Sequence, residues 1–460
     1  MAENKPTGRR FRVLMLPWLA HGHVVPYLEL AKELHHRNFV VHFSSTPAVL
    51  ASLQSAPPNS SPFLSQIHTV PIHLPAAADL PPSRHTTKDL PRHQIFALCK
   101  AFRMSAPAFS LILEEIEPDL VVYDLFQPWA AEAAASRGIP AVCFCITGAA
   151  SIAFTHHLLL RGSTAGFPFP AASMRPNELR TLRENTASID PEDRVAILKS
   201  LELSNDVVLI NTSREIEGKY IDHLSAVLGK SAVPTGSLVR VPGGSGAAEK
   251  AEDHEILRFL DGKQRQSTVY ISFGSEYYLS ATEIHEVAKG LELSGANFVW
   301  VVRFPAGKEA KIEDSMPEGF LERVKGRGVI LEKWAPQIQI LGHQSVGGFV
   351  MQCGWNSFLE SIHFEIPLIA IPMHSEQFIT ARMAAELGIA TEVMRDDDGR
   401  LHGEDIAKAV KIVLEEKEGE EMRGKVKELN AAMAIKGKHG IDDTAALLSG
   451  LCLTSGGGKA

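Results

Sequence analysis

Short apolar runs, each followed by a longer stretch with apolar residues at helical spacing, recur along the whole chain. The run 11–16, for example, is followed by 24–35, where Leu28, Ala31 and Leu34 share one helical face. Alternation of strands and helices is typical of a parallel sheet covered by helices, so we predict an α/β fold. The strand candidates are 11–16, 40–44, 120–123, 141–146 and 207–211 in the first half, and 268–273, 298–303, 328–331, 347–352 and 367–371 in the second.

A change in composition separates the two series of strands. Residues 241–254 are rich in Gly and polar side chains and have no periodic apolar positions, which indicates a linker. With roughly 100–200 residues per domain, the chain is long enough for two domains, which we place at 1–240 and 255–434. Two doubly wound halves would face a cleft lined by loops at the carboxyl ends of their strands. We therefore expect two Rossmann-like domains with the functional residues at strand ends.

Charge and cysteine usage exclude several classes of protein. The 460 residues include 46 Lys plus Arg and 54 Asp plus Glu, a net charge of −8, so we expect no basic surface for nucleic acid. The five cysteines are odd in number and lack CxxC spacing, which indicates neither disulfides nor a zinc site. The longest later apolar stretch, 139–160, is interrupted by Pro140, Gly148 and two histidines, so it lacks the roughly 20 uninterrupted apolar residues of a membrane span. We expect a cytoplasmic protein that binds no membrane.

Two histidines follow the first predicted strand. His21 and His23 lie where a helix begins, and a helix dipole at that place keeps an imidazole neutral and basic. Such a histidine can take a proton from a hydroxyl, and an acidic side chain behind it would stabilise the imidazolium. Asp124, at the end of the strand candidate 120–123, is the candidate for that partner. The residues alone leave open which histidine is the base, and whether either is only a capping or solvated residue.

A second cluster of motifs lies in the second half. Residues 353–357 follow the strand candidate 347–352 and open a helix, whose free N–H groups would bind an anion such as a diphosphate. The plainer interpretation is a capping box, with Ser357 at the N-cap and Glu360 three residues later. Trp334 has two interpretations as well: its flat ring could stack on a nucleobase, or it could be a buried core residue after a strand. These alternatives stay open on the residues alone.

The 44 residues from 334 to 377 contain four motifs at fixed spacing: Trp334-Ala335-Pro336-Gln337, Cys353-Gly354-Trp355-Asn356-Ser357, Glu360 and Glu376-Gln377. This segment closely resembles the signature box of plant family-one UDP-dependent glycosyltransferases, whose fold is of the GT-B type. The resemblance implies a UDP-sugar co-substrate, most simply UDP-glucose because the box ends in Gln, with no other cofactor and no metal. The roles implied are phosphate binding for Asn356 and Ser357, ribose binding for Glu360, and sugar binding for Glu376 and Gln377. The indole of Trp334 suits stacking on uracil, with Gln337 and the backbone beside it for hydrogen bonds to the ring edge. We place Ala335, Gly354 and Trp355 in the same UDP-sugar site.

One residue departs from that family pattern. The family usually has His before Cys-Gly-Trp, where it donates to the diphosphate, and this chain has Gln352. A Gln amide donates without positive charge, and charge-assisted bonds to phosphate are roughly twice as strong. We therefore expect weaker donor use than in a His-bearing relative. The turn after strand 268–273 carries Ser275, which the family places against the phosphates.

The resemblance also selects between the two histidines. Its Gly-His-x-x-Pro pattern matches Gly22-His23 and Pro26, and its charge-relay aspartate matches Asp124. The implied reaction is one in-line displacement with inversion, in which His23 is the base.

Further motifs are similar to the plant branch-forming enzymes, which add a sugar to the sugar of a glycoside. They are 16–23, 125–130 and 272–277. We expect a monomer acting on a flavonoid, lignan or terpenoid glycoside, with the segment from about 435 to 460 packing back on the first half. The alternatives are direct transfer to an aglycone hydroxyl and a non-catalytic UDP-sugar binder.

A dinucleotide-binding oxidoreductase would need Gly-x-Gly-x-x-Gly after a strand, and none follows a strand here.

Overall fold

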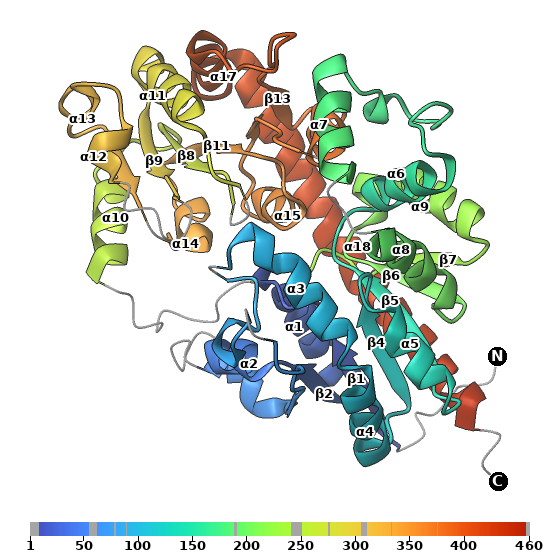
Figure 1. Ribbon diagram of the computed structural model, residues 1–460. Coiled ribbons are helices and arrows are strands. Elements are labelled where there is room, and N and C mark those ends of the chain that lie inside the picture. The colour runs from blue at the N-terminus through green and yellow to red at the C-terminus, as the bar shows by residue number, and fades with distance from the viewer. Residues whose placement is uncertain are drawn as a thin grey trace.

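The chain forms two parallel β-sheets, each covered by helices (Figure 1), and the computed structural model describes residues 9–54, 62–77, 80–88, 90–187, 191–240, 251–274, 277–304, 311–332, 334–374 and 376–456. The predicted α/β fold with two Rossmann-like halves is confirmed. The first sheet has the order β3-β2-β1-β4-β5-β6-β7 and the second the order β10-β9-β8-β11-β12-β13. The strands are β1 Phe11–Leu16, β2 Phe39–Ser45, β3 His68–Pro71, β4 Leu120–Asp124, β5 Ala141–Cys145, β6 Val207–Ile210, β7 Ser231–Pro234, β8 Thr268–Ser272, β9 Asn297–Val301, β10 Gly328–Leu331, β11 Val346–Met351, β12 Leu368–Ala370 and β13 Ala390–Glu392.

The central strands are almost wholly apolar and buried, as expected for parallel strands covered on both faces. The sequence did not predict β3, β7 and β13, which are edge strands of three or four residues. The helices are α1 His21–His35, α2 Pro47–Gln54, α3 Arg92–Arg103, α4 Ala106–Ile116, α5 Pro128–Ala135, α6 Ala149–Arg161, α7 Pro176–Ala187, α8 Pro191–Leu203, α9 Arg214–Leu228, α10 Ala251–Asp261, α11 Ala281–Ser294, α12 Ile312–Ser315, α13 Phe320–Arg323, α14 Gln337–Leu341, α15 Trp355–His363, α16 Gln377–Glu386, α17 Gly403–Glu415 and α18 Lys417–Gly456, with short 3-10 turns at Pro62–Gln66, Pro82–Arg84 and Pro170–Ala172.

The last helix connects the two halves of the molecule. In Figure 1, α18 runs from the second sheet across to the first, and its sequence-later part contacts α9, β4 and β7. Ile441, Ala445 and Leu448 are buried there in the core around the first sheet, and Asp442 pairs with Arg37 of α1 at 2.7 Å. Of the expected linker 241–254, residues 241–250 lie outside the described ranges and residues 251–254 begin α10. The domain boundaries stay a prediction.

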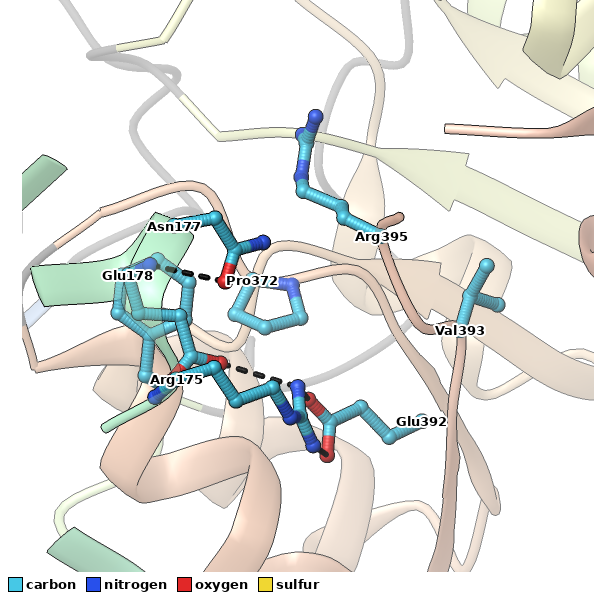
Figure 2. Close-up of a pocket in the computed structure, with 8 residues that line it drawn as sticks. Arg175, Asn177, Glu178, Pro372, Glu392, Val393 and Arg395 are labelled. Atoms are coloured by element: carbon cyan, nitrogen blue, oxygen red, sulfur yellow. Dashed lines mark hydrogen bonds and ion pairs between the residues drawn. The ribbon is translucent and has the colours of Figure 1, made fainter. Parts of the chain in front are cut away.

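Charged side chains join the halves around the pocket drawn in Figure 2. Arg175, just before α7, donates two hydrogen bonds to Glu392 of β13, at 2.7 and 3.1 Å. Glu178 of α7 is buried and pairs with both Arg175 and Arg382 of α16. Because a buried charge is costly unless it is paired, these contacts hold the segment around α7 against α16.

Hydropathy gives one further fact about the helices. Within the described residues, no single helix is both long and apolar enough to cross a membrane. The bent pair Gln94–Arg103 and Ala106–Ile116 meets the length and composition criteria only when its two helices are taken together.

Candidate active site

The reversal of strand order places the candidate residues of each half together. In the first sheet β1 lies beside β4, with Leu16 opposite Tyr123, although about 100 residues separate these strands. In the second sheet β8 lies beside β11, with Met351 opposite Ser272. At such a switch point the loops diverge and leave a crevice at the carboxyl ends of the strands. The chain begins α1 after β1, and begins α15 after β11, at these two crevices.

His23 and Asp124 meet at the first switch point. The Nδ1 atom of His23 lies 2.7 Å from Asp124 Oδ2, which also accepts a longer bond of 3.3 Å from the Trp18 backbone N–H. Asp124 is 1% exposed, and among the described residues no group donates to its second oxygen, Oδ1. A carboxylate facing Nδ1 holds the proton on that nitrogen, which leaves Nε2 as the basic atom.

The other histidine has different surroundings. The ring of His21 lies edge-on to the indole of Trp334, with ring centres 5.3 Å apart. Loss of water around the ring, followed by the charges of Arg240 and Lys88, lowers the pKa of His21. The buried carboxylate therefore faces His23, while His21 contacts the second half.

The first turn of α15 faces the first half with free backbone donors. Gly354 occupies the N-cap position and Trp355 is the first helical residue. Ser357 is thus the third helical residue, so the capping-box interpretation, with Ser357 at the N-cap, is wrong. Since the first N–H groups of a helix have no intrahelical acceptor, this turn presents donors and a positive dipole end to an anion.

A polar cluster lies beside that turn. Gln337 Nε2 donates to Glu360 at 2.5 Å and to Ser357 Oγ at 3.0 Å, while the Tyr270 hydroxyl donates to Gln337 Oε1 at 3.2 Å. Burial raises the pKa of Glu360 to about 7, against the smaller lowering effect of Gln337. Trp334 is 68% exposed, so its ring face is accessible rather than part of the core, and Ala335 is buried.

The loop with Gln352 packs closely on the turn after β8. A Cβ at Gly274, where φ is +70°, would lie 2.1 Å from Gln352 Nε2, so the amide occupies the space that a side chain would need. Gly354 is also close to this amide. Ser275 lies outside the described residues.

Glu376 and Gln377 begin α16. Gln377 is buried, and its Oε1 accepts from the backbone N–H groups of Met373 at 3.1 Å and His374 at 3.3 Å. It therefore holds the loop after β12 in shape. Glu376 is the N-cap residue and is partly exposed.

Two side chains of α15 reach into the first half, which the sequence did not predict. Trp355 Nε1 donates to the backbone oxygen of Asn211 at 2.6 Å. Asn356 Nδ2 donates to the backbone oxygen of Gly22 at 2.7 Å. Helix α15 thus directly contacts the residue next to His23.

Metal ligands do not gather at this site. Within the part of the chain that the structure describes, no group of three or more His, Cys, Asp or Glu side chains could hold a metal ion.

Comparison with protein families covers both halves of the chain. Residues 10–233 match the family model described as the glycosyltransferase N-terminal domain, and residues 237–428 match that of UDP-glucoronosyl and UDP-glucosyl transferase.

Curated relatives align over nearly the whole chain. Beta-D-glucosyl crocetin beta-1,6-glucosyltransferase of Gardenia jasminoides is 40% identical over 95% of this chain and 98% of its own. Mogroside IIIx synthase of Siraitia grosvenorii is 42% identical over 96% of this chain and 93% of its own. Flavanone 7-O-glucoside 2''-O-beta-L-rhamnosyltransferase of Citrus maxima is 40% identical over 92% and 93%.

Solved structures share the fold. A Glycyrrhiza uralensis protein crystallised with glycyrrhetinic acid 3-O-monoglucuronide has a TM-score of 0.81 at 25% identity, over 98% of each chain. A UDP-glucosyltransferase of Polygonum tinctorium capable of glucosylating indoxyl has a TM-score of 0.75 at 26% identity, over 96% of this chain and 99% of its own.

The raised pKa of Glu360 leads to a pH-dependent stability. The ordinary pKa of this carboxyl is near 4.5, so below pH 4.5 it is protonated in both the folded and the unfolded protein and does not affect stability. Between pH 4.5 and about 7 the unfolded protein ionises first, so Glu360 increasingly lowers the free energy of unfolding; above about pH 7 this loss is constant. We expect Glu360→Gln to raise the free energy of unfolding at pH 8 by on the order of 2 kcal/mol, and to change it little at pH 4.5. Urea unfolding at the two pH values measures this, with the exposed Glu322→Gln as control. An equal effect of Glu360→Gln at both pH values would contradict it.

Proposed function

The chain belongs to the family of UDP-glucuronosyl and UDP-glucosyl transferases, and we propose that it transfers glucose from UDP-glucose to a hydroxyl on the sugar of a small-molecule glycoside. As a UDP-dependent glycosyltransferase it uses a UDP-sugar as co-substrate. The observation that carries the chemistry is the His23–Asp124 pair, at 2.7 Å, beside the first turn of α15. The relatives named for glucosyl crocetin and flavanone 7-O-glucoside support an acceptor that already carries a sugar.

The proposed reaction is a single displacement. The Nε2 atom of His23 takes the proton of the acceptor hydroxyl while the hydroxyl oxygen forms a bond to the anomeric carbon of the donor sugar. The bond from that carbon to the UDP oxygen breaks, UDP leaves with the electron pair, and the configuration inverts. Asp124 orients the ring through Nδ1 and stabilises the imidazolium, as the 2.7 Å contact supports.

The donor-binding residues follow the signature box in our proposal. The exposed indole of Trp334 stacks on uracil, and the dipole and N–H groups of α15 face the diphosphate. Glu360 accepts from the ribose hydroxyls. The remaining proposed contacts are uracil with Ala335 and Gln337, the phosphates with Ser275, Gln352, Gly354, Trp355, Asn356 and Ser357, and the sugar with Glu376 and Gln377. The second half, 255–434, thus binds the donor, and the first, 1–240, binds the acceptor.

An apolar wall beside the base supports an acceptor with an apolar aglycone. Phe126 is 39% exposed, and its ring centre lies 5.7 Å from that of His23 and 6.0 Å from that of Trp18. An exposed aromatic face of this kind stacks on sugar or aglycone rings. We infer a flavonoid, lignan or terpenoid glycoside as the acceptor, and a cytoplasmic monomer as the working form.

A substrate panel tests the proposed function. The purified protein is incubated with UDP-glucose and one acceptor at a time, either a flavonoid or terpenoid aglycone or its monoglucoside. Mass spectrometry then measures the masses of the products. We expect one added hexose on monoglucosides only. Hexose on free aglycones would refute the sugar-on-sugar specificity. UDP binding without transfer to any acceptor would instead favour a non-catalytic UDP-sugar binder.

Removing the proposed base separates chemistry from binding. We expect His23→Ala to lower kcat by about 10²–10⁴-fold, because no other group then takes the acceptor proton, while the Kd for UDP stays within a factor of about two. Steady-state kinetics and titration calorimetry measure the two quantities. His36→Ala, an exposed change at the end of the same helix, is the control. Loss of UDP binding in His23→Ala would show a structural role instead.

Restoring the family residue tests the departure at position 352. An imidazolium beside the diphosphate adds charge to a hydrogen bond that the Gln amide makes without it. We expect Gln352→His to lower the KM for UDP-glucose or raise kcat, with kcat/KM up by about 3–10-fold. Unchanged KM and kcat would show that charge at this position is immaterial to donor use.

A further inference from the structure

The indole of Trp355 leaves its own half of the molecule. Trp355 is the first residue of α15, and it is 5% exposed and belongs to a buried apolar cluster that contains residues of both halves. Its Nε1 donates to the backbone oxygen of Asn211, directly after β6, at 2.6 Å. A buried hydrogen bond from a fixed aromatic ring defines both the depth and the direction of the contact.

A glycine makes room for this ring. Gly148 is the N-cap residue of α6, and a Cβ there would lie 2.7 Å from two indole carbons of Trp355 and 2.7 Å from Glu217 Oε1. The backbone of Gly148, with φ −69° and ψ 156°, suits any residue, so the requirement is for space and not for conformation. We call Gly148, Asn211 and Glu217 the indole socket.

The floor of the socket is rigid. Glu217 is completely buried, and its carboxylate accepts from the N–H groups of Ala149 at 2.7 Å and Ala150 at 2.8 Å. These are the first two N–H groups of α6, so the carboxylate caps that helix. Because displacing a buried, hydrogen-bonded carboxylate is costly, Glu217 holds the start of α6, and with it Gly148, in place.

The next residue of α15 contacts the loop of the base. Asn356 Nδ2 donates to the backbone oxygen of Gly22 at 2.7 Å, and Gly22 immediately precedes His23. One helical turn thus contains the N–H groups that face the diphosphate, the bond to the loop of the base, and the ring in the socket. Because a helical turn moves as a unit, the position of the indole sets the position of the other two.

We infer that the Trp355 side chain is a positioning residue: its indole in the socket docks the donor-binding half on the acceptor-binding half and so sets the distance between His23 and the anomeric carbon of the donor. This role rests on the proposed function and adds to it. Donor contacts on the second half do not depend on the socket, so a disturbed socket lowers turnover and not nucleotide affinity. A misplacement of about 1 Å at the reacting atoms can cost on the order of 10²-fold in rate.

Gly148→Ala tests the socket without changing a residue of the donor site or the proposed catalytic pair. The matched control is Gly424→Ala, on an exposed face of α18, where the added Cβ meets no atom within 4 Å. For Gly148→Ala we expect kcat about 10–100-fold below the control, an unchanged Kd for UDP, and an unchanged pH profile of kcat/KM because the His23–Asp124 pair stays intact. A second variant, Trp355→Phe, keeps a ring and the backbone N–H that we propose faces the diphosphate, but it loses the bond to Asn211. It should lower kcat by about 3–10-fold at constant Kd for UDP.

Each outcome decides the inference. If Gly148→Ala folds and keeps kcat within about threefold of the control, the positioning role is refuted. If Gly148→Ala does not fold, a kcat of Trp355→Phe within about threefold of the unmodified enzyme refutes the role instead. Parallel losses of UDP affinity and kcat would also overturn it, because the socket would then serve the nucleotide site. An unmodified enzyme that transfers no sugar to any acceptor would refute the proposed function, and this role with it.

Discussion

Parallel sheets bring loops from distant parts of a chain together only where the strand order reverses, and this constraint determines the whole arrangement described above. The β1/β4 boundary gathers His23 and Asp124, and the β8/β11 boundary gathers Gln352 and the start of α15. Each boundary alone provides half of a reaction site. A complete site needs both crevices to face each other, so the contacts between the halves matter as much as the residues at each strand end.

Those contacts are of two physical kinds. At the outer edge, Arg175, Glu178 and Arg382 form ion pairs, whose attraction acts over several ångströms and tolerates small shifts in distance. Near the reacting groups, the contact is instead a buried ring that leaves no room for a side chain on Gly148, and closely packed atoms resist displacement steeply. Ion pairs can hold the halves together, whereas the packed ring of Trp355 and the neighbouring bond from Asn356 to Gly22 define their spacing more closely.

The sequence predicted the buried central strands well because a fully buried parallel strand is a nearly continuous apolar run. It missed the edge strands β3, β7 and β13, which are short and contain polar residues or Pro, whereas the equally short edge strand β10 was predicted because it is an apolar run. The residues of the signature box were found by pattern, yet their side-chain partners were not. Nothing in the run Cys353 to Ser357 indicates that the Trp355 ring packs on Gly148, more than 200 residues earlier, because such a contact depends on how two separate sheets pack. The capping-box alternative at Ser357 fails because the helix begins at Trp355, which makes Gly354 its N-cap.

The environment of Asp124 shows how this arrangement favours the proposed chemistry. Its carboxylate is almost inaccessible to water, and Oδ2 receives its two hydrogen bonds while Oδ1 receives none from the described residues. Burying a carboxylate with so few partners costs free energy as long as the imidazole of His23 is neutral. When His23 takes the acceptor proton, the same carboxylate faces a cation at 2.7 Å in a region with little water, and the cost becomes an attraction. The fold therefore stabilises the charge that appears during proton transfer more than it stabilises the resting pair, which is the condition for an interaction to accelerate a reaction.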